Sequence, residues 1–168
     1  MSGPRLPRVG WALVLCGLLA ASAAAQPSET ALTESGIISD IVDAVSPTCS
    51  ANITISFGGD QPVEDGELLA PPEAAAAPNL TIVSGGEALF TLLTLDPDAP
   101  DPANPTRRSI LHYLVTNVPA GGAASEGTEV ADPVAAANNS RANFDARAFA
   151  SQYGLGDPCG VAWFLAQP

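Results

Sequence analysis

The residues best suited to chemistry lie close together in the middle of the chain. One group is Asp96-Pro97-Asp98-Ala99-Pro100, and the other is His112, the only histidine, with Tyr113 beside it. Prolines fix φ and cannot donate backbone hydrogen bonds, so the preceding strand must end here in one rigid conformation. We expect one carboxylate to face a pocket while the other ties the loop to backbone amides or to Arg107 or Arg108.

This grouping is typical of either an anion site or a structural turn. A buried histidine needs a hydrogen-bond partner, and a carboxylate is the natural one. A protonated histidine held in this way donates to an anion such as phosphate. The alternative is that Asp-Pro-Asp only builds a turn and that His112 is a satisfied core residue. Both interpretations stay open on the local pattern.

Enzymatic chemistry is not expected. The chain has no Gly-x-Ser-x-Gly elbow and no second histidine for a zinc site. Asp96, Asp98 and His112 could in principle bind a metal, but prolines at this density favour a rigid wall over converging ligands. We therefore predict a binding protein without a cofactor or a metal.

Short strands must position these groups. Residues 53–57 alternate apolar and polar, which predicts a strand that ends at Gly58-Gly59. Residues 88–95 and 110–118 are nearly continuous apolar runs, which predicts buried strands on either side of the aspartate loop, here defined as residues 96–100. Further strands are predicted at 80–83 and 161–165.

Helices are predicted only towards the two ends of the domain. Apolar spacing predicts one near 35–44 and another that begins after Asn143 or Asp145 and ends at Gly154. Residues 60–78 and 119–139 have loop-like composition. Strands dominate without a βαβ alternation, so we predict a mainly β fold with antiparallel-rich sheets and short peripheral helices.

The first 25 residues have the composition of a secretory signal peptide. Arg5 and Arg8 precede an apolar run at 11–20, and small residues at 21–25 lead to a predicted cleavage after Ala25. A transmembrane anchor is the rival interpretation, but the run is shorter than the ~20 residues that a spanning helix needs. Residues 26–168 are then expected to form one secreted domain, without a transmembrane segment.

The charge of the chain excludes some partners. Its formal net charge is −12, and residues 1–25 hold two of the six basic and none of the eighteen acidic residues, which leaves −14 after cleavage. So acidic a surface repels nucleic acid and anionic lipid faces at long range. A small local anion site is still compatible with it.

Secretion also bears on the cysteines and asparagines. Cys49 and Cys159 remain after cleavage, and an oxidising compartment favours one disulfide between them over two separate buried thiols. Asn52, Asn79 and Asn138 each begin an Asn-x-Ser/Thr motif and are candidate glycosylation sites.

Three stretches together resemble the phosphatidylethanolamine-binding protein family, in its secreted branch. The central stretch runs from Leu92 through the aspartate loop and Asn104-Pro105 to Leu111-His112-Tyr113 and Pro119. Residues 53–59 and 74–79 upstream, and 143–164 downstream, are also similar to the family. The likeness covers most of residues 37–168.

This resemblance implies a sandwich-like core of two sheets and a small surface pocket for phosphate-like head groups. By motif matching, Asp96 and His112 line that pocket, Asp98 and Pro100 shape it, and Arg108 pairs with a carboxylate. The family's second signature, Gly-x-His-Arg-Tyr, is missing, which predicts a domain truncated between about 130 and 142 that lacks some central strands.

The resulting hypothesis is a secreted, non-enzymatic protein that binds a phosphate-containing small molecule or a phospholipid head group. One alternative is an extracellular protease inhibitor that acts through surface contacts. Another is a degenerate or mis-spliced product without a binding function.

Overall fold

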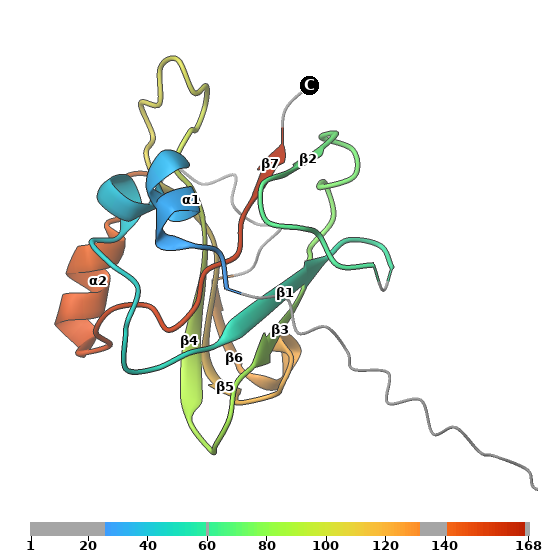
Figure 1. The fold of residues 1–168 in the computed structure, drawn as a ribbon. Helices are drawn as coiled ribbons and strands as arrows, with labels where there is room; N and C mark the ends of the chain where they lie inside the picture. Colours follow the sequence, from blue (N-terminus) through green and yellow to red (C-terminus); the bar gives the residue numbers. More distant parts are fainter. Residues whose placement is uncertain (1–25, 60, 132–140, 167–168) are drawn as a thin grey trace, which may run out of the picture.

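The computed structural model describes residues 26–59, 61–131 and 141–166, and β-strands dominate them (Figure 1). The strands are β1 (Asn52–Ser56), β2 (Glu67–Leu69), β3 (Asn79–Val83), β4 (Leu89–Asp96), β5 (Ile110–Pro119), β6 (Thr128–Ala131) and β7 (Phe164–Ala166). The helical elements are α1 (Glu29–Glu34), η1 (Ile37–Ile41), η2 (Ala124–Glu126) and α2 (Ala146–Tyr153). The predicted mainly β fold with antiparallel-rich sheets is confirmed.

The two apolar runs pair with each other as expected. β4 and β5 form a long antiparallel ladder from Leu89↔Pro119 to Asp96↔Ile110, and β6 adds antiparallel to the other edge of β5. Val115 and Val118 of β5 are fully buried and belong to the hydrophobic core. This three-stranded sheet, here called the inner sheet, therefore holds the best-packed part of the core.

A second ladder covers the inner sheet. β1 and β3 pair antiparallel, and a bridge from Thr81 to Ala123 links β3 to the turn before η2. Ile55, Leu80 and Ile82 alternate inward from this ladder and belong to the same buried cluster as Val115. The cluster thus has sheet on both sides, the layering that alternating strands produce.

The predicted helix near 35–44 is wrong in its placement. α1 begins after Ser28, whose hydroxyl accepts the N–H of Ala31, and ends before Gly36. Gly36 has φ of 78°, and Ser39 inside η1 has φ of 108°, so the chain bends sharply where a continuous helix was expected. Glycine tolerates such a positive φ without strain, which makes it a frequent helix end.

The C-terminal elements follow the prediction more closely. α2 has Asp145 as N-cap, whose carboxylate accepts the N–H of Ala148, and Gly154 as left-handed C-cap. The predicted strand at 161–165 is observed later, as β7. β7 pairs in parallel with β2, which lies in the stretch 60–78 expected to be loop-like, as β6 lies in 119–139. Both missed strands are only three or four residues long, too short to show a period.

The disulfide between Cys49 and Cys159 is confirmed. Around it, the N–H of Ser46 donates to Pro158 O at 2.9 Å, and the N–H of Ala51 donates to Cys159 O at 2.9 Å. Gln26 completes this seam, since its amide donates to Asn52 and accepts the N–H of Val161. The C-terminal segment is therefore fixed against the start of β1.

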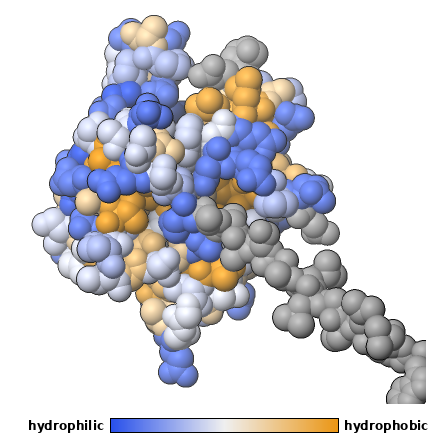
Figure 2. Space-filling view, in the orientation of Figure 1, coloured by the Kyte–Doolittle hydropathy of each residue, from blue (hydrophilic) through white to orange (hydrophobic). Residues whose placement is uncertain are grey.

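Apolar residues also appear on the surface. Leu68 of β2 is 62% exposed, Val130 of β6 is 61% exposed and Leu165 of β7 is 37% exposed. Figure 2 shows apolar patches broken up by polar residues on one face. Across the described part of the chain, no helix combines the length and the apolar character that crossing a membrane requires.

Candidate functional site

Asp96 and His112 come together at the end of the inner sheet. Asp96 is the last residue of β4 and is paired with Ile110 of the adjacent β5, and His112 lies two residues further along β5, diagonally across from Asp96. His112 Nε2 lies 3.8 Å from Asp96 Oδ2, with side chains that are 38% and 41% exposed. The distance suits an ion pair with a protonated ring but exceeds a hydrogen bond. His112 was expected inside a buried strand, and its half-exposed ring is open to a ligand.

Asp96 is held in its ionised form. Its interaction with the His112 ring is the largest influence and lowers the pKa of the carboxyl below its usual value. Partial burial opposes this change, while the backbone N–H groups of Asp98 and Ala99 add to it. The N–H of Asp98 donates to Asp96 Oδ1 at 2.8 Å, so one oxygen orders the loop while the other faces His112. The site therefore holds a negative charge beside the His112 ring.

Arg108 fixes the rest of the aspartate loop. Its Nε donates to the carbonyl of Pro97 at 2.6 Å, and its Nη2 lies 3.0 Å from Asp98 Oδ1. Its Nη1 reaches Asp40 Oδ2 at 2.8 Å, far away in sequence. The expected pairing of Arg108 with a carboxylate is thus observed twice. A planar guanidinium with several fixed donors is suited to such a junction.

The N-terminal partner of Arg108 is itself held by a second arginine. The strap, here defined as residues 39–43, carries Asp40 and Asp43. Arg147 of α2 donates to Asp43 Oδ1 at 2.7 Å and to the carbonyls of Ser39, Asp40 and Val42 at 2.6, 3.2 and 3.1 Å. Through the strap, α2 is therefore connected to Arg108 and to the loop beside Asp96.

Some of these contacts were not predictable from residue types. Arg147 binds mainly backbone carbonyls, and carbonyls leave no pattern in a sequence. Arg141 donates to the carbonyl of His112 at 2.9 Å, which supports the strand beside the site. Pro100, expected to shape the pocket, is exposed and follows a cis peptide bond.

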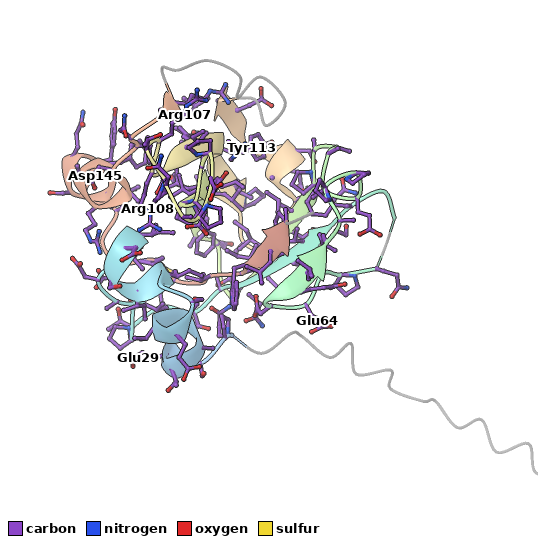
Figure 3. All side chains as sticks on the ribbon, turned by 90° about the horizontal axis from the view of Figure 1, so that it is seen from above. Glu29, Glu64, Arg107, Arg108, Tyr113 and Asp145 are labelled. Carbon is purple, nitrogen blue, oxygen red and sulfur yellow. A yellow bond between two sulfur atoms is a disulfide. The ribbon has the colours of Figure 1, made fainter. Side chains whose placement is uncertain are left out.

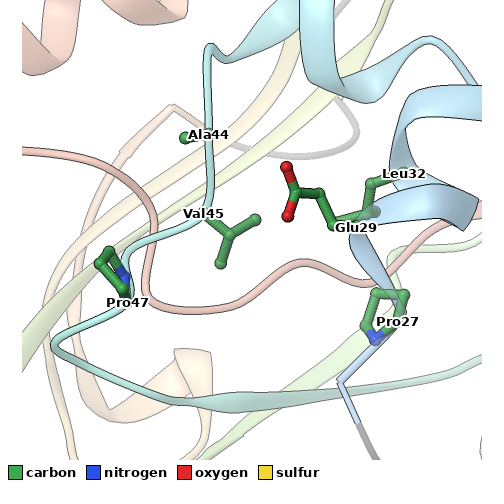
Figure 4. Close-up of a pocket in the computed structure, with 6 residues that line it drawn as sticks. All are labelled: Pro27, Glu29, Leu32, Ala44, Val45 and Pro47. Atoms are coloured by element: carbon green, nitrogen blue, oxygen red, sulfur yellow. The ribbon is translucent and has the colours of Figure 1, made fainter.

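Two cavities lie away from the Asp96–His112 pair. The α1 cavity measures about 260 Å³ and has Pro27, Glu29 and Leu32 on one side. Figure 4 shows these residues across from Ala44, Val45 and Pro47. The α2 cavity measures about 320 Å³ and is lined by Asp40, Ile41, Arg108, Ser109 and residues 143–147. Arg108 therefore contacts the aspartate loop and also lines the α2 cavity.

The structure also bears on the predictions about metal binding and glycosylation. Within the described residues, no group of three or more His, Cys, Asp or Glu side chains could hold a metal ion. Asn52 is half-buried in β1 and accepts a hydrogen bond from Gln26, whereas Asn79 is exposed at the start of β3. Asn138 and residues 1–25 lie outside the described residues, so the signal peptide stays a prediction.

The sequence of this chain matches a known family. The family model of phosphatidylethanolamine-binding proteins matches residues 49–159. Protein BROTHER of FT and TFL 1 from Arabidopsis thaliana is 33% identical over 158 residues, which cover 78% of this chain and 87% of the relative. Protein FLOWERING LOCUS T from the same plant is 30% identical over 162 residues, covering 81% and 90%.

Solved structures agree on the fold. The phosphatidylethanolamine-binding protein pfl0955c from Plasmodium falciparum superposes with a TM-score of 0.53 at 20% identity, over 64% of this chain and 60% of its own. The CG7054 solution structure gives a TM-score of 0.52 at 24% identity, over 79% and 91%. At these identities the likeness concerns the fold alone.

The alignments also show that the relatives are longer within the matched region. The 158-residue match to the first relative takes in 78% of these 168 residues, which is fewer residues than the match is long. The relative thus carries a stretch without a counterpart here. Its predicted position between about 130 and 142 stays a prediction, because residues 132–140 lie outside the described part. With the family model matched across most of the domain, the chain belongs to the phosphatidylethanolamine-binding protein family.

Proposed function

We propose that this protein binds a phosphate-type anion, such as a phospholipid head group, at Asp96 and His112, and that it does so outside the cell. The observation that carries the proposal is the half-exposed ion pair between the His112 ring and a carboxylate kept ionised. A protonated imidazole donates charge-assisted hydrogen bonds to a phosphate oxygen. Asp96 lies next to the ring, with Nε2 of His112 3.8 Å from its Oδ2.

The surroundings of the pair favour a small ligand over an extended surface. Arg108 uses its Nε and both terminal nitrogens on Pro97, Asp98 and Asp40. It therefore stiffens the loop beside the ligand, while His112 supplies the donor. One protonated histidine gives modest affinity, so we expect a Kd of order 1 mM for a free head group.

Titration with phosphoethanolamine tests the binding step. Since His112 is the only histidine, its imidazole NMR signals are unambiguous. We expect them to shift and saturate with phosphoethanolamine and with inorganic phosphate, but not with ethanolamine, which lacks the phosphate. The His112→Gln variant has no imidazole, so its binding is followed by the 31P signal of the ligand, which should shift with wild type and not with the variant. An unmoved imidazole at ten times the expected Kd would refute the proposal.

Two further measurements address localisation and the rival function. Expression of the full chain in eukaryotic cells should deliver a product to the medium that begins at Gln26, the residue after the predicted cleavage. A product kept inside the cells with residues 1–25 intact would contradict secretion. Inhibition of an extracellular protease without any response of His112 to phosphate would favour the inhibitor alternative.

A further inference from the structure

The α2 cavity has the lining of a second ligand site. It contains neither Asp96 nor His112 among its lining residues. Its volume of about 320 Å³ lies at the small end of the range of ligand pockets, ~300–1,000 Å³. Figure 3 shows Arg108 on the same side of the molecule as Asp145 at the start of α2. The cavity is thus large enough for a single small molecule.

The charges around the cavity balance. Arg108 and Arg147 supply two guanidinium groups, and Asp40 and Asp145 supply two carboxylates. Each of these groups already has a partner: Asp40 pairs with Arg108, Asp145 caps α2, and Arg147 holds the strap. An anion would meet the two carboxylates, and a cation would meet the two guanidinium groups. The lining therefore favours a ligand without net charge.

Two uncharged polar side chains in the lining have unused hydrogen-bonding capacity. Ser109 is only 6% exposed, yet its hydroxyl has no hydrogen-bond partner among the described residues. Asn143 also lines the cavity, and its side-chain amide is likewise unpaired in the described part of the chain. A hydroxyl and an amide can each donate and accept. A polar ligand in the cavity could therefore form hydrogen bonds with both side chains.

The cavity also has an aromatic wall. Phe144 lines it, and its ring is supported by Phe149, with ring centroids 5.5 Å apart. The face of an aromatic ring is negative, so it attracts the weakly positive C–H groups of a saturated ring. A ligand that matches the whole lining has hydroxyl groups on its rim and C–H groups on one face.

We propose that the α2 cavity binds a neutral sugar, specifically one hexopyranose ring. The hydroxyls of the sugar donate to and accept from Ser109, Asn143 and the free carboxylate oxygen of Asp145. Its C–H face packs on Phe144. The cavity contains neither Asp96 nor His112, and Arg108 links it to the loop beside the proposed anion site.

The probe is a panel of methyl glucopyranoside, mannopyranoside and galactopyranoside. Saturation-transfer NMR with the full secreted product should show transfer to the ring C–H protons of at least one sugar, with a Kd of order 1–10 mM. Ser109→Ala and Asn143→Gly should each weaken binding at least fivefold. Glycine suits position 143 because Asn143 has φ of 60°, so the backbone is preserved.

Two controls separate this site from other effects. Ser151→Ala, at an exposed position of α2 outside the cavity, should leave sugar binding unchanged. His112→Gln should remove the phosphate response but keep sugar binding, so that failure of one proposal is distinguishable from failure of the other.

Three results would overturn the inference. These are no transfer to any of the three sugars, equal binding by wild type, Ser109→Ala and Asn143→Gly, or amide shifts at residues 143–147 with phosphoethanolamine but with no sugar. The last result would assign the cavity to a zwitterion.

Discussion

The inner sheet and the outer segments of this domain are stabilised in different ways. In the inner sheet, the long β4–β5 ladder buries Val115 and Val118 completely, and neither cysteine of the disulfide lies in its strands. The outer segments, here residues 26–51 and 146–166, bury Leu32 and little else fully. They are held instead by the disulfide, by Gln26 and by the two arginines around the strap. Burial therefore stabilises the inner sheet, whereas the disulfide, hydrogen bonds and ion pairs hold the outer segments in place.

Removal of the disulfide should have the largest effect, and it should act on the outer segments first. The bond joins residues 110 positions apart. For a loop of that size, chain entropy gives about 4–5 kcal/mol of stabilisation. Cys49→Ser with Cys159→Ser should lower the free energy of unfolding by about this amount, measured by urea denaturation. Hydrogen exchange should rise around residues 158–166 before it rises in β5. Equal loss of protection in both regions would show that the disulfide does not stabilise the outer segments preferentially.

The next largest loss of stability should come from a cavity created in the inner sheet. Val115→Ala removes two methyl-sized groups from a fully buried position, at a cost of about 2 kcal/mol. Gly127 lies against the same side chain, since a Cβ there would lie 2.5 Å from Val115 Cγ1. Here protection in β4 and β5 should fall together. Val83→Ala, at a 47% exposed position, is the matched control and should cost under ~0.5 kcal/mol.

Loss of Arg147 on α2 should destabilise the protein less, and its effect should be confined to the strap and α2. Arg147→Ala removes four hydrogen bonds to the strap, and we expect a loss of about 1–2 kcal/mol. Arg147→Lys should recover only part of it, because an ammonium lacks the planar fork. Arg107→Ala serves as the control, since the Arg107 side chain is exposed and pairs with no described residue. Chemical denaturation of the three variants measures the free energy of unfolding of each. It shows whether Arg147 stabilises the protein through its hydrogen bonds or only through its positive charge.

The Asp96–His112 pair should contribute a pH-dependent amount to the stability of the fold. The pKa of Asp96 is lower in the folded protein, so its contribution is present above the ordinary value of 3.8 and is lost as pH falls through the folded pKa. Asp96→Asn should therefore be less stable than wild type at pH 7. Both partners are about 40% exposed, so the difference should be under ~1 kcal/mol. Melting curves of the two proteins should converge towards pH 2.

The smallest change in stability is expected at Asp65, where substitution should stabilise the protein instead of destabilising it. Burial raises the pKa of this carboxyl, the N–H of Trp163 partly offsets that, and Glu64 adds to it. The ionised form then costs stability above pH 3.8, and this cost is absent in strong acid. Asp65→Asn keeps an oxygen for the backbone N–H of Trp163 at 3.1 Å. Because the side chain is exposed and solvent screens its charge, the substitution should stabilise the protein by no more than ~0.5 kcal/mol at pH 7. Destabilisation at neutral pH would contradict this account.

The inner sheet was also the part most predictable from the sequence. Its two long strands are continuous apolar runs, and the antiparallel return that brings Asp96 to His112 follows from their order. α2 was marked by Asp145 and Gly154 at its ends. By contrast, β2 and β6 are too short to show a period, and η1 bends at Ser39 although its isoleucines have helical spacing. The contacts of Arg147 could not be foreseen, because its partners are carbonyls that every residue carries.

The cross-link between Cys49 and Cys159 has a further consequence for how the protein withstands proteolysis. Every peptide bond between these residues lies inside one covalent ring, including those of the exposed segment 70–77. A protease that cuts once in that segment opens the ring but releases no fragment. The nicked molecule should run as a single species until a reductant separates its two halves. In an extracellular setting, the domain can therefore lose a peptide bond without losing a strand.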